Sequence, residues 1–224
     1  MLPTTLEEIA NYIVADGKGI LAADESTGTI EKRFKSIDVE STEENRRKYR
    51  EMLFRSSAMT EAIGGVILFD ETLRQNAADG TPLREVILSQ KSLPGIKVDQ
   101  GVQPFNGSDK EKTTQGLDGL DERCKEYDSL GAKFTKWRAV INIGDSIPSN
   151  ECINDNMVSL AKYAAIAQQN NMVPIVEPEV IMDGNHSIDQ CYEVTKNVLL
   201  KLFELLEKES VSIKGTLLKP NMVV

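Results

Sequence analysis

The sequence predicts an α/β fold of repeated βα units, an incomplete (β/α)8 TIM barrel with about six units present. Two observations support this prediction. Short apolar runs rich in β-branched residues alternate with longer stretches of helical periodicity. The runs also begin roughly 30 to 45 residues apart, which suits βα units with long loops. Because no linker or internal repeat divides the chain, residues 1–224 are interpreted as one partial-barrel domain.

The apolar runs predict strands because they are short and mostly end in a polar or charged residue: Gly19–Ala23, Gly64–Phe69, Gly95–Val98, Phe134–Ile141, Val173–Val176 and Gly215–Leu218. The stretches between them predict helices: Thr42–Met59, Leu83–Lys91, Leu117–Leu130, Ile153–Gln169 and Ile188–Glu209. The first helix opens with a capping-box pattern from Ser41 to Glu44. The glycine-rich and charged stretch Gly101–Gln115 is predicted to be a loop.

The composition is that of an ordinary globular domain, with 40% hydrophobic and 27% charged residues. The net charge of −9 argues against nucleic acid or an anionic membrane as the main partner, but a local basic pocket could still bind an anionic substrate. No secretory signal and no run of about 18 apolar residues is found, so we expect a cytoplasmic protein. Three widely spaced cysteines, Cys124, Cys152 and Cys191, predict buried free thiols rather than a metal site.

In a parallel barrel, functional side chains collect at the carboxyl ends of the strands. The polar residues at these predicted ends are Asp24, Glu25, Ser26 and Thr29, then Asp70 and Glu71, Lys97 and Asp99, Lys136 and Arg138, Glu177 and Glu179, and finally Lys219. Several lysines beside carboxylates predict Schiff-base chemistry. Neighbouring cations and desolvation lower the pKa of a lysine, a neutral amine attacks a ketone, and a carboxylate moves the protons.

Each of these features alone has a simpler structural interpretation. A single lysine at a strand end, or the Glu177-Pro-Glu179 turn, is most often solvated. The stretch Asp24–Thr29 fits both a helix N-cap and a phosphate seat. Trp137 is interpreted as a packing residue and His186 as an exposed turn residue. The joint occurrence of lysines and glutamates at successive strand ends favours the functional interpretation.

The chain resembles class I fructose-1,6-bisphosphate aldolase along almost its whole length, from about Ala10 to the last residue. The resemblance is carried, in order, by GKGILAADESTGTI (Gly17–Ile30), TEENRRKYR (Thr42–Arg50), GGVILFDETL (Gly64–Leu73), GIKVD (Gly95–Asp99), TTQGLDGLDERC (Thr113–Cys124), AKFTKWRAV (Ala132–Val140), VPIVEPEV (Val173–Val180) and GTLLKPNMV (Gly215–Val223).

The resemblance implies a role for each matching residue. Lys219 matches the lysine that forms the Schiff base, Glu177 the general acid and base, and Glu179 its supporting neighbour. Lys136 matches a lysine beside the iminium, and Asp24 the aspartate that holds substrate hydroxyls and the Schiff-base lysine network. Ser26, Thr29 and Lys97 match residues that hold one phosphate, and Arg138, Lys32 and Arg33 match basic residues near the site. The implied reaction cleaves fructose 1,6-bisphosphate to dihydroxyacetone phosphate and glyceraldehyde 3-phosphate without a cofactor or a metal ion.

The family implied by the resemblance continues past the last residue through two more βα units and a tail ending in tyrosine. We therefore expect this chain to be an incomplete or truncated aldolase, inactive or nearly so alone. The resemblance implies a homotetramer for the complete family and leaves assembly of a shorter chain open. A second hypothesis is a non-catalytic product that binds partners through an open barrel face. A third is another Schiff-base barrel lyase, such as a transaldolase, which Asp24–Ser26 and the Glu-Pro-Glu pair fit poorly.

Overall fold

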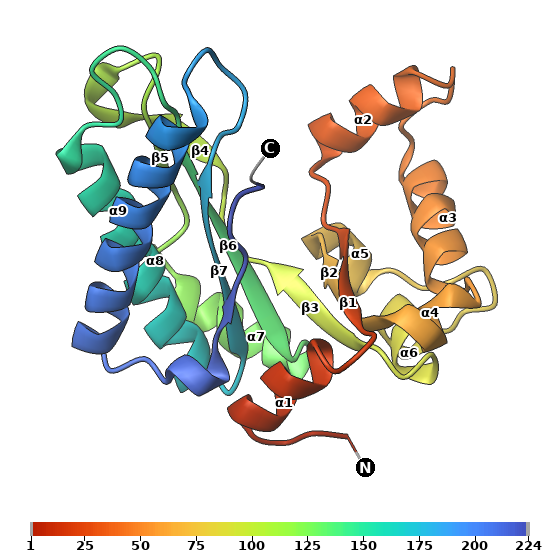
Figure 1. Cartoon of the computed structure of the whole chain (residues 1–224). Coiled ribbons are helices and arrows are strands. Elements are labelled where there is room, and N and C mark those ends of the chain that lie inside the picture. Colours follow the sequence, from red (N-terminus) through yellow and green to blue (C-terminus); the bar gives the residue numbers. More distant parts are fainter. Residues whose placement is uncertain (1, 223–224) are drawn as a thin grey trace.

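A computed structural model of the chain describes residues 2–222. Its main sheet has six parallel strands in the order β1-β2-β3-β6-β7-β8 and curls into part of a barrel (Figure 1). The predicted fold class is confirmed. The parallel strands are β1 (Gly19–Ala23), β2 (Ile63–Leu68), β3 (Leu93–Lys97), β6 (Phe134–Ile141), β7 (Val173–Val180) and β8 (Leu217–Leu218).

Most helices lie outside the sheet and connect its strands, whereas α1 precedes the first strand. The α-helices are α1 (Leu6–Ile13), α2 (Thr27–Lys35), α3 (Glu43–Phe54), α4 (Ala58–Ala62), α5 (Asp70–Arg74), α6 (Leu83–Ser89), α7 (Leu120–Ser129), α8 (Asn150–Gln169) and α9 (Ile188–Lys208). Two single 3₁₀ turns occupy Phe105–Gly107 and Ile213–Gly215. Among residues 2–222, no helix is long and apolar enough to cross a membrane.

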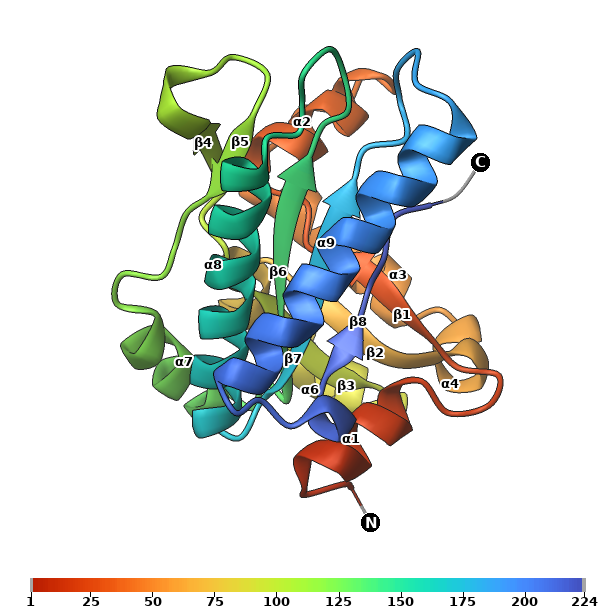
Figure 2. The same cartoon turned by 60° about the vertical axis from the view of Figure 1, so that its left-hand side comes forward.

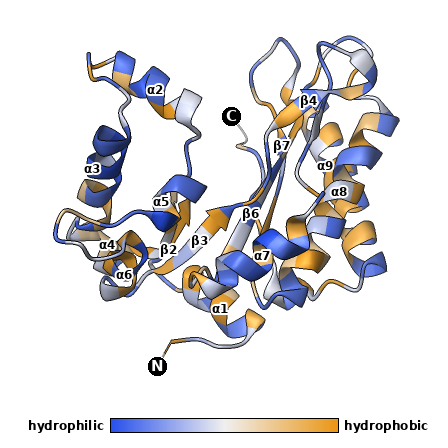
Figure 3. Ribbon diagram, turned by 180° about the vertical axis from the view of Figure 1, so that it is seen from behind, coloured by the Kyte–Doolittle hydropathy of each residue, from blue (hydrophilic) through white to orange (hydrophobic). Residues whose placement is uncertain are grey.

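The larger hydrophobic core lies between the outer face of the sheet and the surrounding helices. Helices α8 and α9 pack together over β6 and β7 (Figure 2). Trp137 is fully buried on this side, with its ring stacked on Tyr163 at a centroid distance of 5.4 Å. This confirms the interpretation of Trp137 as a packing residue. Figure 3 shows hydrophobic residues along β2 and β3, alternating hydrophobic and hydrophilic bands on α8 and α9, and hydrophilic stretches on β6 and β7.

A smaller core closes the inner face of the sheet at the amino ends of the strands. Helix α1 lies there, and its Ile13 packs in one cluster with Ile67, Phe134 and Ile175. Phe134 fits only because the neighbouring strand carries Gly95 at the paired position, where a Cβ atom would overlap the Phe134 ring. This apolar layer fills the inside of the sheet at the amino ends of the strands. At the opposite, carboxyl ends, the inward side chains are charged.

The predicted helix Thr42–Met59 is wrong in its extent and its cap. The structure divides it into α3 and α4, because the helix ends at Arg55 and a second short helix starts after Ser57. The N-cap is Thr42, whose hydroxyl accepts a hydrogen bond from the Asn45 amide at 3.1 Å, rather than Ser41 paired with Glu44. A hydroxyl one residue further along therefore satisfies the first free amides of the helix.

Most other predicted ends differ from the structure by a few residues, and two differences change the description of the site. The stretch Gly101–Gln115 contains an antiparallel hairpin of β4 (Val102–Pro104) and β5 (Lys112–Thr114) rather than loop alone. Strand β7 continues through Pro178 to Val180, because its last residues pair with the equally long β6. Glu177 and Glu179 are therefore inside a strand and not in a turn after it. Helices α1, α2 and α5 were not predicted; all three are short.

Candidate active site

A cleft of about 1040 Å³ opens at the carboxyl ends of the parallel strands. It is lined by every residue that the sequence singled out as catalytic or substrate-binding: Asp24, Ser26, Thr29, Arg33, Lys97, Lys136, Arg138, Glu177, Glu179 and Lys219. These residues come from five separate segments and meet only because parallel strands present their carboxyl ends to one side. Lys32, named beside Arg33 in the sequence, is not among the lining residues.

The alternation of β6 and β7 explains why charge collects in one layer. Along β6, the inward positions run from Phe134 in the lower core to Lys136 and Arg138 in the cleft. Along β7 they run from Ile175 to Glu177 and Glu179, and Arg138 pairs in register with Glu177. The expectation that each pair shares a side is confirmed. Lysines and glutamates are thus held on rigid strands rather than on loops.

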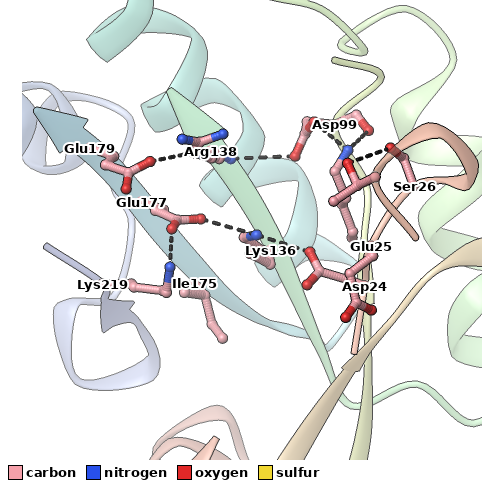
Figure 4. A network of polar contacts seen from close by, with 12 residues as sticks. Asp24, Glu25, Ser26, Asp99, Lys136, Arg138, Ile175, Glu177, Glu179 and Lys219 are labelled. Carbon is pink, nitrogen blue, oxygen red and sulfur yellow. Dashed lines mark hydrogen bonds and ion pairs between the residues drawn. The ribbon is translucent and has the colours of Figure 1, made fainter. Parts of the chain in front are cut away.

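A chain of four charged side chains crosses the middle of the cleft (Figure 4). The Lys219 amine donates to Glu177 Oε1, and Lys136 Nζ lies 3.2 Å from the other oxygen of the same carboxylate. Lys136 Nζ also donates to Asp24 Oδ2 at 2.9 Å. The Glu177 side chain is 2% exposed whereas that of Lys219 is 47% exposed, so the chain runs from a reachable amine into the protein.

The second oxygen of Glu177 is buried and, within the part of the chain that the structure describes, accepts no hydrogen bond. Its contact with Lys136 is an ion pair whose angle falls outside hydrogen-bond geometry. The Lys136 ammonium at 3.2 Å compensates the charge of this oxygen but leaves it able to accept a further hydrogen bond. The oxygen is also a site where a transferred proton or a substrate hydroxyl could be held. Glu177 can therefore exchange a proton at Oε2 while Oε1 contacts the Lys219 amine.

Lys136 remains a cation in this setting. Burial alone would lower its pKa, but the carboxylates of Asp24 and Glu177 outweigh burial and raise the pKa above its usual value. The expectation that desolvation and neighbouring cations lower the pKa of the clustered lysines is wrong for Lys136. The sequence showed the number of charges at the strand ends but not that two acids would flank this amine.

Three further cations on the cleft wall are each held by a carboxylate. Arg138 Nε contacts Glu179 Oε2, and Arg33 Nη1 contacts Glu25 Oε1. Lys97 Nζ donates to the side chain of Asp99 at 2.5 Å and to its carbonyl oxygen at 2.7 Å. An anionic ligand would have to share these cations with their present partners or displace the partners. Arginine suits such sharing because its guanidinium carries five N–H donors.

Two hydroxyl groups lie at the start of α2. Ser26 is the N-cap residue, yet its side chain makes no capping bond to the helix and instead lies 3.1 Å from the Thr29 hydroxyl. Both residues are exposed to the cleft. Ser26 therefore occupies the N-cap position, as the first interpretation predicted. The two hydroxyls and the free amides at the start of the helix could also bind an anion.

Some cleft residues were missed from the sequence. Arg74 pairs with Asp70 at 3.0 Å and with Glu126 at 2.6 Å, which links α5 to α7 along one wall. Arg123 donates to the carbonyl of Val98 at 2.8 Å, at the end of β3. The four-residue spacing of Asp70 and Arg74 on a helix was a usable signal for the first pair. Arg123 gave none, because its partners are backbone atoms distant in sequence.

The remaining sequence predictions for titratable groups fall outside the cleft. Cys124, Cys152 and Cys191 are free and buried, as predicted. His186, expected to be an exposed turn residue, is partly exposed near the start of α9. Within residues 2–222, no group of three or more His, Cys, Asp or Glu is arranged to hold a metal ion.

A comparison with family models matches residues 5–224 to the family described as fructose-bisphosphate aldolase class-I. Among curated proteins, "Probable fructose-bisphosphate aldolase class 1" of Xanthomonas axonopodis pv. citri is 54% identical over 219 residues. That match covers 98% of this chain and 66% of the Xanthomonas protein. "Fructose-bisphosphate aldolase 6, cytosolic" of Arabidopsis thaliana is also 54% identical, over 97% of this chain and 61% of the plant protein.

Among solved structures, fructose-bisphosphate aldolase from Plasmodium falciparum, in complex with TRAP and a small-molecule inhibitor, superposes with a TM-score of 0.95 at 49% identity. The superposition covers 98% of this chain and 64% of the Plasmodium chain. This chain therefore spans about two thirds of the length of the relatives it matches.

Proposed function

The chain belongs to the class-I fructose-bisphosphate aldolase family, and from that membership we propose that its cleft supplies Lys219 as the Schiff-base lysine for the cleavage of fructose 1,6-bisphosphate. The products are dihydroxyacetone phosphate and glyceraldehyde 3-phosphate. One observation carries the proposal: a half-exposed amine contacts a buried carboxylate whose other oxygen lies beside a second ammonium group. Charged side chains that are buried together in a cleft are candidates for a functional site.

In the first step, Lys219 attacks the ketone carbon as a free amine. Glu177 accepts the proton that the amine loses and returns one to the carbinolamine hydroxyl, which leaves as water. The contact between Lys219 Nζ and Glu177 Oε1 supports this assignment, because a general base must lie within hydrogen-bond reach of its proton. The protonated imine that results is an electron sink.

In the second step, the bond between C3 and C4 breaks and its electron pair enters the protonated imine to form an enamine. The C4 hydroxyl gives up its proton, and the aldehyde leaves. Protonation of the enamine at C3 and addition of the water released earlier regenerate Lys219 and release dihydroxyacetone phosphate. Glu177 is the proposed proton carrier, because its second oxygen is buried and accepts no hydrogen bond from the described residues.

The other cleft residues bind and orient the substrate in this proposal. Asp24 holds substrate hydroxyls and anchors Lys136 at 2.9 Å, and Lys136 keeps a positive charge beside Glu177. Glu179 supports the site from the next inward position of β7, through its ion pair with Arg138. One phosphate is assigned to the wall built from Ser26, Thr29 and Lys97, with Arg33 and Arg138 nearby. Hydroxyls, a helix start and basic side chains together suit a phosphate group.

Borohydride trapping with dihydroxyacetone phosphate tests the proposal directly. Borohydride reduces the imine to a stable secondary amine, so peptide mapping by mass spectrometry locates the modified lysine. We expect one adduct per chain, on Lys219, and none in Lys219→Arg. Dihydroxyacetone without phosphate should react more slowly, because it lacks the group that the basic wall binds. An adduct on another lysine, or none on well-folded protein, would contradict the proposal and favour the non-catalytic, partner-binding hypothesis.

We also propose a cytoplasmic homotetramer without a nucleic-acid partner. The assembly is the one that the family resemblance implies, and the location is the one expected from the sequence; one relative carries "cytosolic" in its name. The net charge of −9 supports the absence of a nucleic-acid partner. Light scattering on a size-exclusion column tests the assembly. Four chains per particle are expected, and a monomer across the concentration range would contradict it.

A further inference from the structure

The turn Asp24–Ser26 carries two important groups, the acid that pairs with Lys136 and the N-cap of α2. The hydrogen-bonded ladder between β1 and β2 ends one residue earlier, at Ala23 and Leu68. Within residues 2–222, β1 also lies at the edge of the sheet. Sheet pairing therefore does not hold the turn in place, and another group has to do so.

Arg50 of α3 reaches this turn from outside the cleft. Its Nη2 atom donates to the carbonyl oxygen of Glu25 at 2.7 Å, and its Nη1 atom donates to the Thr72 hydroxyl at 2.5 Å. The side chain is fully buried, and its guanidinium lies 6.0 Å from the centre of the Phe69 ring. One planar group thus bridges the end of β1 and the start of α5.

Stability alone does not explain a guanidinium in this position. Burial is the largest influence on Arg50 and lowers its pKa. Its nearest carboxylate oxygens, on Glu25 and Glu71, are both 3.8 Å away, and its Nε atom has no partner among the described residues. A buried charge with long ion pairs and an unused donor gains little stability over an apolar residue. The Arg50 guanidinium instead makes two short hydrogen bonds at once, which its rigid, planar set of N–H donors allows.

We propose that Arg50, anchored on Thr72, is a positioning residue that holds the Glu25 carbonyl and thereby places Asp24 against Lys136. The effect on the reaction rests on the proposed function. The placement of Asp24 does not, because it is a property of the folded chain. A lysine at this position keeps the charge but cannot make both bonds of the fork.

The test compares Arg50→Lys with Arg46→Lys. Arg46 lies one turn earlier on α3 and is 9% exposed. It pairs with both oxygens of Glu71, at 2.8 and 2.6 Å, and its third bond goes to the Ser41 carbonyl. Both substitutions therefore replace a buried arginine fork by a lysine on the same helix. Only the first removes a bond to the turn that carries Asp24.

The first readout is the pKa of Lys136, followed by NMR of lysine labelled at Cε and Nζ and assigned with Lys136→Met. Asp24 from the end of β1 and Glu177 from β7 face this amine, and the Lys219 amine shares Glu177. If Asp24 moves away from Lys136, the amine loses one of the two carboxylates that raise its pKa. The pKa of Lys136 should then fall in Arg50→Lys and stay unchanged in Arg46→Lys.

The second readout is the rate of the borohydride-trapped adduct on Lys219. We expect a loss of about tenfold to 100-fold in Arg50→Lys, the size typical of a misplaced catalytic group, and little change in Arg46→Lys. If the unsubstituted chain forms no adduct, the proposed function fails while the NMR readout still decides this inference. Equal pKa values and equal rates in folded Arg50→Lys and the unsubstituted chain would overturn it.

A second variant covers the case in which Arg50→Lys does not fold. Thr72→Val keeps the shape of a fully buried side chain and removes only the hydroxyl that anchors Arg50. A fall of the Lys136 pKa in the same direction, by a smaller amount, supports the proposal. An unchanged Lys136 pKa in folded Thr72→Val overturns the proposal, because the position of the Arg50 guanidinium would then not depend on its bond to Thr72.

Discussion

The carboxylate of Glu177 contacts the Lys219 amine, although its side chain is 2% exposed and that of Lys219 is 47% exposed. The acid is held by β7, whose next inward residue, Glu179, is also in the cleft. The lysine follows the short strand β8 and is fixed by its own amide, which donates to the Val176 carbonyl at 3.0 Å. A substrate can therefore reach the amine while the acid stays shielded from water.

Replacing Glu177 by glutamine should slow formation of the trapped adduct on Lys219 by about 10²- to 10⁴-fold, because the amide cannot accept the amine proton. Quenching with borohydride at a series of times and measuring intact mass gives the rate. Glu193→Gln is the matched control, since Glu193 is exposed on α9 and pairs with Lys196. Equal rates for the two variants would show that Glu177 does not carry the proton.

The raised pKa of Lys136 predicts how stability depends on pH. The folded-state value lies above the unfolded value of about 10.5, so the stabilisation is complete below about pH 10.5 and is lost as pH rises through the folded-state value. Lys136→Met lacks this stabilisation, leaves Asp24 without its lysine partner and leaves Glu177 with Lys219 alone. The variant should be less stable by about 3–5 kcal/mol at pH 8.

Urea unfolding at several pH values between 8 and 12 checks this. The difference in the free energy of unfolding between the unsubstituted chain and Lys136→Met should shrink above pH 10.5. Lys136 of the unsubstituted chain then loses its ammonium charge, which the variant lacks at every pH. The two proteins share every other titratable group, so the contributions of those groups cancel in the difference. A difference that stays constant to pH 12 would mean that Lys136 gains nothing from its two carboxylates.

The fold and the members of the site could be predicted from the sequence because both depend on local patterns. Strand β6 was predicted with its correct ends, since it is rich in aromatic and β-branched residues. Strand β7 was cut short because Pro178 is read as a strand end, and only pairing with β6 keeps it extended. The bond between Arg50 and Glu25 could not be predicted, because it joins two elements whose proximity the tertiary fold alone decides.

The three cysteines should resist thiol reagents in the folded chain. Cys124 is fully buried, and burial raises its pKa to about 12. At pH 8, four units lower, about one thiol in ten thousand is ionised. Ellman's reagent at pH 8 should give almost no colour until urea is added, and then three thiols per chain. Peptide mapping after limited reaction should find Cys191 modified first, because it is 8% exposed. Rapid native modification of Cys124 would contradict the buried position on α7.

The lower core should tolerate no side chain at position 95. Gly95 pairs in register with Phe134 on the neighbouring strand, and a Cβ atom there would overlap the Phe134 ring. Gly95→Ala is therefore expected to lower the free energy of unfolding by about 1–3 kcal/mol, the usual cost of overpacking. Urea unfolding at neutral pH measures it.

Two further variants test whether the Phe134 ring is the cause. Gly28→Ala is the control, because Gly28 lies in exposed α2 with no atom within 4 Å of the added Cβ. It should gain up to about 1 kcal/mol from helix propensity. Phe134→Leu combined with Gly95→Ala should cost less than the two single changes added together, since the smaller side chain leaves room for the methyl group. Strict additivity would mean that the strain at Gly95 comes from another neighbour, and the lower core would then not depend on this pair of strand positions.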